Sequence, residues 1–291
     1  MTIYISKKFQ AIEILKDENI SINFNGCKHV AKNIGIVNLM PKKSETEAQI
    51  VKLLNNCDED LNIHFIKINT YKSEHENYRY MQLNYEDFDE IKQKLDGIII
   101  TGAPLEKIEF RDVSYIDELN AILDYIRKNK KYSLYICWGA QVALNHFYGV
   151  RKELKESKIF GVFRHKIIKR DDILKDVYNS FKSPHSRYTS LNRQDIENSN
   201  SLELLAITEE NEEHILKGNF NDYYILGHLE YDKDTLKKEY LRDLNKGLKI
   251  NIPKYYFKNN SIESDIDFSW REDAIKIYSN WIKIISKDNG K

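Results

Sequence analysis

The first half of the chain alternates short apolar runs, rich in β-branched residues, with longer segments whose apolar residues recur at helical spacing. The apolar runs predict buried strands at 33–39, 63–68, 95–101 and 133–136. The segments between them predict helices at 45–54, 88–94, 115–129 and 141–148. Strands that alternate with helices are typical of a parallel sheet covered on both faces. We therefore predict an α/β fold whose ligands collect at the carboxyl ends of the strands.

The second half of the chain has shorter apolar runs. They predict strands at 159–168, 202–207, 213–216 and 223–226, followed by helices at 235–248 and 270–285. This pattern favours a mixed or antiparallel extension of the sheet. The chain has no internal repeat and no low-complexity segment, so one continuous domain over 1–291 is expected.

Three local features complete the predicted layout. Residues 1–32 lack periodicity and predict an N-terminal arm, and the polar, Tyr-rich residues 70–85 predict a loop. Ser44 stands three residues before Glu47, which predicts a capping box at the start of the helix over 45–54.

Composition excludes several classes of protein. The 45 lysines and arginines balance the 45 aspartates and glutamates, so no nucleic-acid partner is expected. No apolar run reaches transmembrane length, and the first ten residues lack a signal-peptide layout, so no membrane partner is expected. The three cysteines form no CxxC pair, which argues against a disulfide scaffold and favours a reducing, cytoplasmic location; no role is evident for Cys27 and Cys57. The histidines form no HxH or HExxH pattern and the glycines no phosphate-binding loop, so neither a metal nor a nucleotide cofactor is expected.

A cysteine at a strand-to-helix turn is the main candidate for chemistry. Cys137 directly follows the predicted strand 133–136, and Gly139 and a helix follow it. A helix N-terminus can lower a thiol pKa and supply backbone N–H groups to an oxyanion. Those donors would be the N–H of Trp138 and one from the loop at Gly102. Alternatively, Cys137 is a small apolar residue packed at a strand end.

A candidate base lies beyond the last predicted strand. His228 is followed two residues later by Glu230, and alternation in an extended segment would place both side chains on one side. Glu230 could then orient the imidazole of His228, completing a triad with Cys137. A solvated pair at a strand end is the alternative. The polar cluster at 184–187 is typical of a turn that either binds an amino acid or phosphate or is simply a loop.

Several motifs, in order along nearly the whole chain, resemble those of the homoserine O-acyltransferases of methionine biosynthesis, the homoserine transsuccinylase type. They are Asn38-Leu39-Met40-Pro41-Lys42-Lys43 with Glu45-Thr46-Glu47, Ile100-Thr101-Gly102-Ala103-Pro104-Leu105-Glu106, Cys137-Trp138-Gly139-Ala140-Gln141, Ser183-Pro184-His185-Ser186-Arg187, Gly227-His228 with Glu230-Tyr231-Asp232, and Ser269-Trp270-Arg271 with Asn280-Trp281. The resemblance implies a flavodoxin-like fold related to class I glutamine amidotransferases.

The resemblance also implies a ping-pong mechanism. Cys137 would attack an acyl-CoA to form a thioester, and His228, oriented by Glu230, would then activate the γ-hydroxyl of L-homoserine. Lys158 would lie near the acyl group or the oxyanion, while Ser186 and Arg242 would contact homoserine, with Arg242 at its carboxylate. The resemblance further implies a homodimer, and no cofactor beyond acetyl-CoA as co-substrate.

The acyl donor depends on the residue at Glu106. In the family this position carries glycine with succinyl-CoA and glutamate with acetyl-CoA, and a glutamate would repel a succinyl carboxylate, so acetyl transfer is expected. Two residues depart from the family pattern: Leu229 replaces a proline, and Arg164 replaces a glutamate near the expected site. The alternatives are succinyl-CoA as donor, L-serine as acceptor, glutamine hydrolysis, or a non-catalytic binding module.

Overall fold

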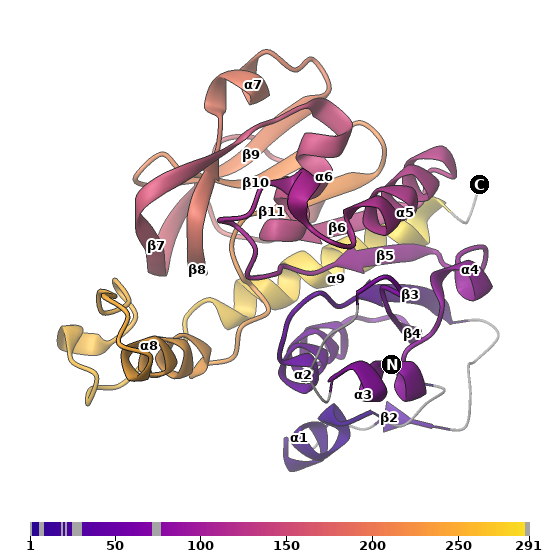
Figure 1. The fold of residues 1–291 in the computed structure, drawn as a ribbon, viewed down its shortest axis with the longest axis horizontal. Helices are drawn as coiled ribbons and strands as arrows, with labels where there is room; N and C mark the ends of the chain where they lie inside the picture. Colours follow the sequence, from indigo (N-terminus) through magenta and orange to yellow (C-terminus); the bar gives the residue numbers. More distant parts are fainter. Residues whose placement is uncertain are drawn as a thin grey trace.

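A computed structural model of the chain describes residues 2–5, 9–18, 20, 22–24, 31–71 and 77–288. Within these residues one sheet of eleven strands runs through the molecule in the order β2-β1-β4-β3-β5-β6-β11-β10-β9-β7-β8 (Figure 1). The strands are β1 (Ile3–Tyr4), β2 (Ile22–Asn23), β3 (Lys32–Val37), β4 (Leu61–Ile66), β5 (Gly97–Ile100), β6 (Tyr132–Ile136), β7 (Lys152–Ile167), β8 (Ser180–Leu191), β9 (Leu202–Thr208), β10 (Glu213–Gly218) and β11 (Asp222–Ile225).

Two layers of helices cover the parallel half of this sheet. The α-helices of the described residues, not all of which belong to these layers, are α1 (Ala11–Asp17), α2 (Lys43–Leu54), α3 (Asn77–Asn84), α4 (Phe88–Ile91), α5 (Ile116–Lys128), α6 (Trp138–Tyr148), α7 (Arg193–Glu197), α8 (Thr235–Asn245) and α9 (Arg271–Asp288). One apolar cluster joins α1, α2 and α9 to the sheet, and a second joins α4, α5 and α6 to it. Because the strands are buried on both sides, they are nearly continuous apolar runs, as the sequence predicted.

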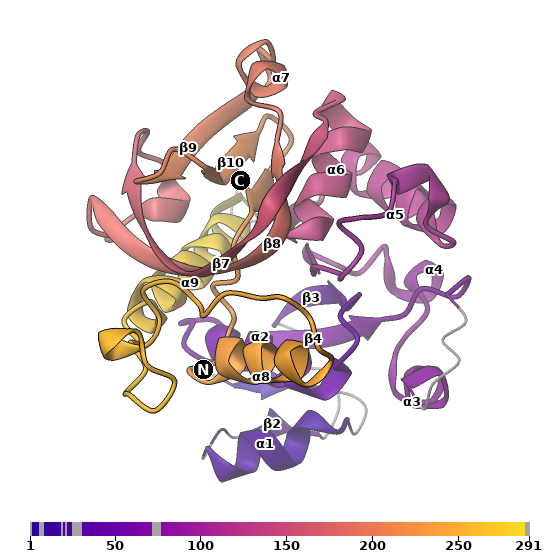
Figure 2. The same cartoon turned by 60° about the vertical axis from the view of Figure 1, so that its left-hand side comes forward.

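The remaining strands form the antiparallel extension that the sequence predicted. β11 lies parallel to β6, whereas β10, β9, β7 and β8 follow it in antiparallel pairs. After β11 the chain enters α8, which lies in front of α2 in Figure 2. The Gln49 amide of α2 donates a hydrogen bond of 2.9 Å to the Thr235 hydroxyl at the start of α8. Residues of β7, β8 and α8 line one cavity together with Ala103 and Cys137, which follow the carboxyl ends of β5 and β6.

The N-terminal arm joins the sheet rather than packing on its surface. Among its described residues, β1 pairs with β4 in parallel, and β2 pairs with β1. Among the described residues, the structure has no helix long and apolar enough to cross a membrane.

Two of the three predicted local features were wrong. The expected loop over 70–85 contains helix α3, and 72–76 lie outside the described residues. The Tyr80 and Tyr85 hydroxyls both donate to the Glu47 carboxylate, Tyr85 at 2.7 Å, so tertiary contacts hold this polar segment in place. The capping box fails for a related reason: α2 begins at Lys43, which puts Ser44 inside the helix, and Glu47 is engaged by these tyrosines.

The polar cluster at 184–187 is not a turn but the middle of strand β8, paired with β7. Its polar residues are buried because they find partners in the interior. The Arg187 guanidinium is fully buried, and it donates to His185 Nδ1 at 3.2 Å and to the Thr189 carbonyl.

Candidate active site

The turn at Cys137 has the strained geometry of a nucleophile elbow. Its φ of 49° and ψ of −115° are unusual for any residue other than glycine. Its N–H donates to the Ile225 carbonyl of β11 at 2.7 Å, and its carbonyl accepts the Gln141 N–H of the first helical turn at 3.1 Å. The thiol therefore leaves a sharp bend between β6 and α6.

Glycine at 139 allows this bend to sit tightly against β5. A Cβ there would lie 2.5 Å from the Thr101 carbonyl oxygen and 3.0 Å from that of Ile100. The Trp138 side chain points away from the elbow, since its ring packs against Phe110 and Tyr115 at centroid distances of 6.1 and 6.2 Å. As the first residue of α6, Trp138 offers the site its backbone N–H.

Gly102 brings Cys137 and His228 together. A Cβ at Gly102 would lie 3.2 Å from the Cys137 Cβ and 3.4 Å from the His228 Cε1. The backbone of the loop after β5 thus runs directly beside the elbow and the imidazole. This is the second place at which the sequence predicted an oxyanion donor.

His228 and Glu230 are in contact, although not for the predicted reason. His228 Nδ1 lies 2.7 Å from Glu230 Oε1, and both side chains are buried. The segment after β11 is a turn, not an extended strand, and the Tyr231 N–H donates to the His228 carbonyl at 3.2 Å. The Tyr231 ring stacks on the imidazole at a centroid distance of 4.2 Å, which fixes the plane of His228.

The surroundings of His228 favour its protonated form. Burial alone would lower the pKa of His228, but the neighbouring Cys137 and Glu230 outweigh burial and raise that pKa well above its ordinary value. The Cys137 thiol contributes to this shift both as a charge and as a hydrogen-bond partner. The imidazole of His228 is therefore held in its protonated form beside the Cys137 side chain.

A second polar group lines the same cavity as Cys137 and His228 and is organised by Glu239, which the sequence did not predict. Its carboxylate accepts hydrogen bonds from Ser186 Oγ at 2.6 Å and Lys158 Nζ at 2.7 Å, and lies 3.5 Å from Arg242 Nη2. Asp243 adds a second carboxylate, 2.7 Å from the Arg242 guanidinium. The three residues predicted to bind substrate thus meet at one acidic side chain.

All the predicted side chains of the site except Glu230 line one cavity of about 450 Å³. These residues are Cys137, His228, Glu106, Lys158, Ser186 and Arg242, with Glu230 behind the imidazole. Burial raises the pKa of Glu106, while its own backbone N–H, Lys158 and His228 oppose the shift.

Neither of the two departures from the family pattern lines this cavity. Arg164 is half exposed beside Glu209 and lines a different hollow, so the expectation that it lies near the site was wrong. Leu229 is buried in the apolar core. Cys57 is buried, and burial raises its pKa to about 12, whereas Cys27 lies outside the described residues.

A cluster of three buried histidines joins β7, β8 and β10, and no local motif indicated it because its members come from three strands. His165, His185 and His214 offer ring nitrogens within 4.8 Å of one another. However, Arg187 Nε–H donates to His185 Nδ1, so His185 carries its proton on Nε2, which faces His165 Nε2 at 2.9 Å. That proton and the adjacent guanidinium make the cluster a poor fit for a cation.

Comparison with known proteins finds homoserine acyltransferases both by family model and by sequence identity. The family model described as homoserine O-succinyltransferase matches residues 2–290. The chain is 40% identical to homoserine O-acetyltransferase 1 of Ilyobacter polytropus, over 97% of this chain and 96% of that protein. It is 42% identical to the homoserine O-acetyltransferase of Clostridium tetani, over 97% and 95%.

The fold is also similar to solved glutamine amidotransferases. A glutamine amidotransferase from Thermotoga maritima matches with a TM-score of 0.62 at 9% identity, covering 88% of this chain and 99% of the other. A glutamine amidotransferase from Methylobacillus flagellatus matches with a TM-score of 0.55 at 11% identity, covering 87% and 94%. The predicted fold, a parallel sheet of the class I glutamine amidotransferase type, is confirmed.

Proposed function

Because this chain belongs to the homoserine O-succinyltransferase family, a family of acyltransferases, we propose that it transfers an acetyl group from acetyl-CoA to the γ-hydroxyl of L-homoserine. One observation carries the proposal: the cavity brings Cys137 and His228 together with the polar group around Glu239. A nucleophile, a base and a site for a zwitterion therefore face one another.

In the first half-reaction Cys137 Sγ attacks the acetyl carbonyl of acetyl-CoA. The backbone N–H groups of Trp138 and of the loop at Gly102 stabilise the oxyanion. The bond between the carbonyl carbon and the CoA sulfur then breaks, and the departing thiolate takes the proton of the His228 imidazolium. Coenzyme A leaves, and the acetyl group remains on Cys137 as a thioester.

In the second half-reaction the homoserine hydroxyl attacks this thioester. His228 Nε2 removes the hydroxyl proton, Glu230 stabilises the resulting imidazolium, and the Cys137 thiolate leaves. The products are O-acetyl-L-homoserine and the starting ion pair, so protons and electrons balance.

The polar group around Glu239 fits the charged end of the acceptor. Arg242 presents a guanidinium fork that suits a carboxylate, with Lys158 as a second cation. The Glu239 carboxylate is the natural partner of the α-ammonium group, with Ser186 beside it. A zwitterionic amino acid would replace the present internal ion pairs with matching ones of its own.

Acetyl is favoured over succinyl because Glu106 lines the catalytic cavity. A carboxylate there fills space and repels the distal carboxylate of a succinyl group. Succinyl-CoA is the second candidate donor, since the matching family model carries that name. The homodimer and the cytoplasmic location expected from the sequence stay predictions.

The direct experiment supplies purified protein with L-homoserine and either acetyl-CoA or succinyl-CoA and measures release of CoA. We expect release with acetyl-CoA and an acetyl adduct on Cys137 by mass spectrometry when the acceptor is omitted. Cys137→Ala should abolish both signals, whereas Cys57→Ala, which removes the other described cysteine, should keep them. Absence of CoA release with both donors would refute the proposal, and a preference for succinyl-CoA would refute only the choice of donor.

A further inference from the structure

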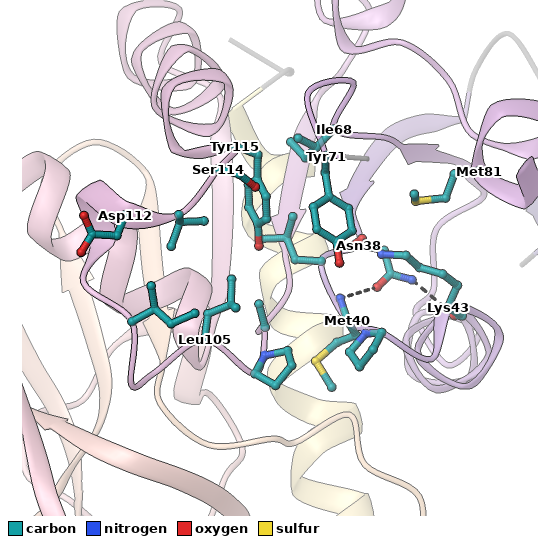
Figure 3. Close-up of a pocket in the computed structure, with 16 residues that line it drawn as sticks. Asn38, Met40, Lys43, Ile68, Tyr71, Met81, Leu105, Asp112, Ser114 and Tyr115 are labelled. Carbon is teal, nitrogen blue, oxygen red and sulfur yellow. Dashed lines mark hydrogen bonds between the residues drawn. The ribbon is translucent and has the colours of Figure 1, made fainter. Parts of the chain in front are cut away.

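We propose that a second cavity, next to the catalytic one, binds the pantetheine arm of the acyl-CoA donor; this inference rests on the proposed acyl transfer. The cavity, here called the arm pocket, has a volume of about 270 Å³ and lies beyond the carboxyl ends of β3 and β5 (Figure 3). Its lining is chiefly apolar and includes Leu39, Ile68, Leu105, Val113 and Tyr115.

The arm pocket shares a wall with the catalytic cavity. Met40, Pro41, Ala103, Pro104 and Ile108 line both spaces. Ala103 directly follows Gly102, whose Cα faces the Cβ of the nucleophile and the imidazole of the base. The lining of the arm pocket therefore begins one residue beyond the backbone that touches the nucleophile and the base, and a chain that leaves the reacting sulfur along this loop runs toward it.

The chemistry of the two half-reactions favours a path of the pantetheine arm into the arm pocket. Attack by the acceptor hydroxyl is the counterpart of CoA departure, so the CoA sulfur and the hydroxyl oxygen occupy the same position beside His228. From there the arm could extend toward the charged groups of Lys158, Glu239 and Arg242 or toward the apolar lining of the arm pocket. The pantetheine arm is uncharged, with methyl and methylene groups and a few amides. Burying it against the charged groups would desolvate them without partners, which is costly.

The volume of the arm pocket suits the pantetheine arm rather than the whole CoA molecule. Pockets that hold complete small molecules usually measure roughly 300–1,000 Å³ and are mostly apolar with a few placed polar groups. This one is slightly smaller, so the nucleotide of CoA would remain outside.

The polar end of the arm pocket is held in place by internal bonds (Figure 3). The Asn38 side chain donates to the Tyr85 hydroxyl at 2.9 Å and accepts the Met40 N–H at 3.1 Å. Lys43 Nζ donates to the Asn38 carbonyl at 2.6 Å. The wall is therefore preformed, which lowers the entropic cost of binding an elongated, flexible group.

The test fills the arm pocket from its rim and measures binding directly. Ser114 lines the pocket and is exposed, so Ser114→Trp adds bulk without altering the core, and Leu105→Trp is a second filling variant. Ala121→Trp, at an exposed position of α5, is the matched control. Each is combined with Cys137→Ala, and calorimetry measures binding of CoA, pantetheine and 3′,5′-ADP.

We expect the filling variants to weaken the binding of CoA by about ten-fold or more and to abolish the binding of pantetheine. Their affinity for 3′,5′-ADP should stay unchanged, and the Ala121→Trp protein should bind all three ligands as the parent protein does. Equal CoA affinity in the Ser114→Trp, Leu105→Trp and parent proteins would overturn the proposal, as would failure of the Cys137→Ala protein to bind CoA.

Kinetics with Cys137 intact separate this proposal from the proposed function. In Ser114→Trp the KM for acetyl-CoA should rise, whereas the KM for L-homoserine and turnover with the truncated donor S-acetyl-N-acetylcysteamine should stay at wild-type values. A wild-type enzyme that transfers acetyl groups while the variant keeps its KM for acetyl-CoA would refute the arm pocket and leave the proposed function standing.

Discussion

Lys158 Nζ lies 2.7 Å from Glu239 Oε1, although the two residues come from β7 and α8 and are separated by 81 positions in the chain. The same carboxylate accepts a hydrogen bond from Ser186, and it lies close to Arg242. Three side chains that the family resemblance assigned to substrate binding are thus ordered by a fourth that no motif indicated. The first prediction therefore concerns Glu239.

Glu239→Gln keeps the shape of the side chain but removes its charge. We expect the KM for L-homoserine to rise about ten- to a hundred-fold, the effect of losing a charge-assisted hydrogen bond, with little change in the KM for acetyl-CoA. Glu203→Gln makes the same change at an exposed carboxylate paired with Lys169 and should leave both constants unchanged. An unchanged KM for homoserine in Glu239→Gln would show that this carboxylate does not bind the acceptor.

The sequence predicted the parts of this site that depend on local structure. The elbow at Cys137 joins an apolar strand to a helix, and both patterns are contained in adjacent residues. The contact between His228 and Glu230 was also predicted, although a turn and not an extended strand produces it. Over so short a separation, either geometry brings the two side chains together.

The parts that the sequence did not predict depend on contacts between distant segments. Glu239 looks like any acidic residue on a lysine-rich helix, and only the approach of α8 to β7 and β8 gives it partners. β8 was missed because Pro184, His185 and Arg187 are typical of loops. They occur in a buried strand here because the interior supplies hydrogen bonds that no local pattern encodes.

The link between His228 and Glu230 gives a second prediction. Glu230→Gln removes a negative charge that raises the pKa of His228, so that pKa should fall. If the reactive form is the thiolate–imidazolium pair, the alkaline limb of the pH–rate profile must move to lower pH, and kcat should drop by about 10²- to 10⁴-fold. The profile of the first half-reaction, followed by CoA release, measures both effects.

A matched control exists elsewhere in the chain. Glu86 Oε1 lies 2.9 Å from His64 Nδ1, outside the catalytic cavity, so Glu86→Gln should leave the profile unchanged. An alkaline limb that stays in place in Glu230→Gln would argue against the ion pair as the reactive form.

Glu106 gives a third prediction, about the donor. Glu106→Gly removes the carboxylate from the catalytic cavity, and we expect the ratio of kcat/KM for succinyl-CoA over acetyl-CoA to rise by about ten-fold or more. Glu109→Gly, at a nearby exposed glutamate that does not line the cavity, should keep the wild-type ratio. Equal ratios in the two variants would mean that another feature selects the acyl group.

The close approach at Gly139 gives a fourth prediction, about stability. In Gly139→Ala the new methyl group would meet the carbonyl oxygens of Thr101 and Ile100, which cannot move without displacing the end of β5. Overpacking of this kind costs about 1–3 kcal/mol, and we also expect loss of CoA release because the elbow must shift. Thermal unfolding and the CoA assay measure the two effects.

Gly149→Ala is the comparison for this variant. Gly149 has a φ of 69° but open space around its Cα, so alanine there should cost only about 1 kcal/mol of backbone strain and leave activity intact. Equal activity of the Gly139→Ala and Gly149→Ala proteins would contradict the steric account of the elbow.

The histidine cluster of β7, β8 and β10 gives the last prediction, about pH. Burial, and then the charge of Arg187, lowers the pKa of His165 to about 3, and burial lowers the pKa values of His185 and His214 well below the ordinary value. The unfolded chain binds protons to these residues near pH 6.5, whereas the folded chain keeps them neutral. Unfolding therefore takes up protons as the pH falls below about 6.5, and each histidine lowers the free energy of unfolding by up to about 1.4 kcal/mol per pH unit.

His214 is the best member of the cluster to replace, because neither of its ring nitrogens has a hydrogen-bond partner among the described residues. In His214→Leu the free energy of unfolding, from urea titrations between pH 7 and pH 5, should fall less steeply with decreasing pH than in the wild type. The slope should differ by up to about 1.4 kcal/mol per pH unit, the contribution of one buried neutral imidazole. Leu154→Ala, at an exposed residue without a titratable side chain, is the control and should keep the wild-type slope. If His214→Leu keeps that slope too, protonation of His214 does not contribute to the loss of stability in acid.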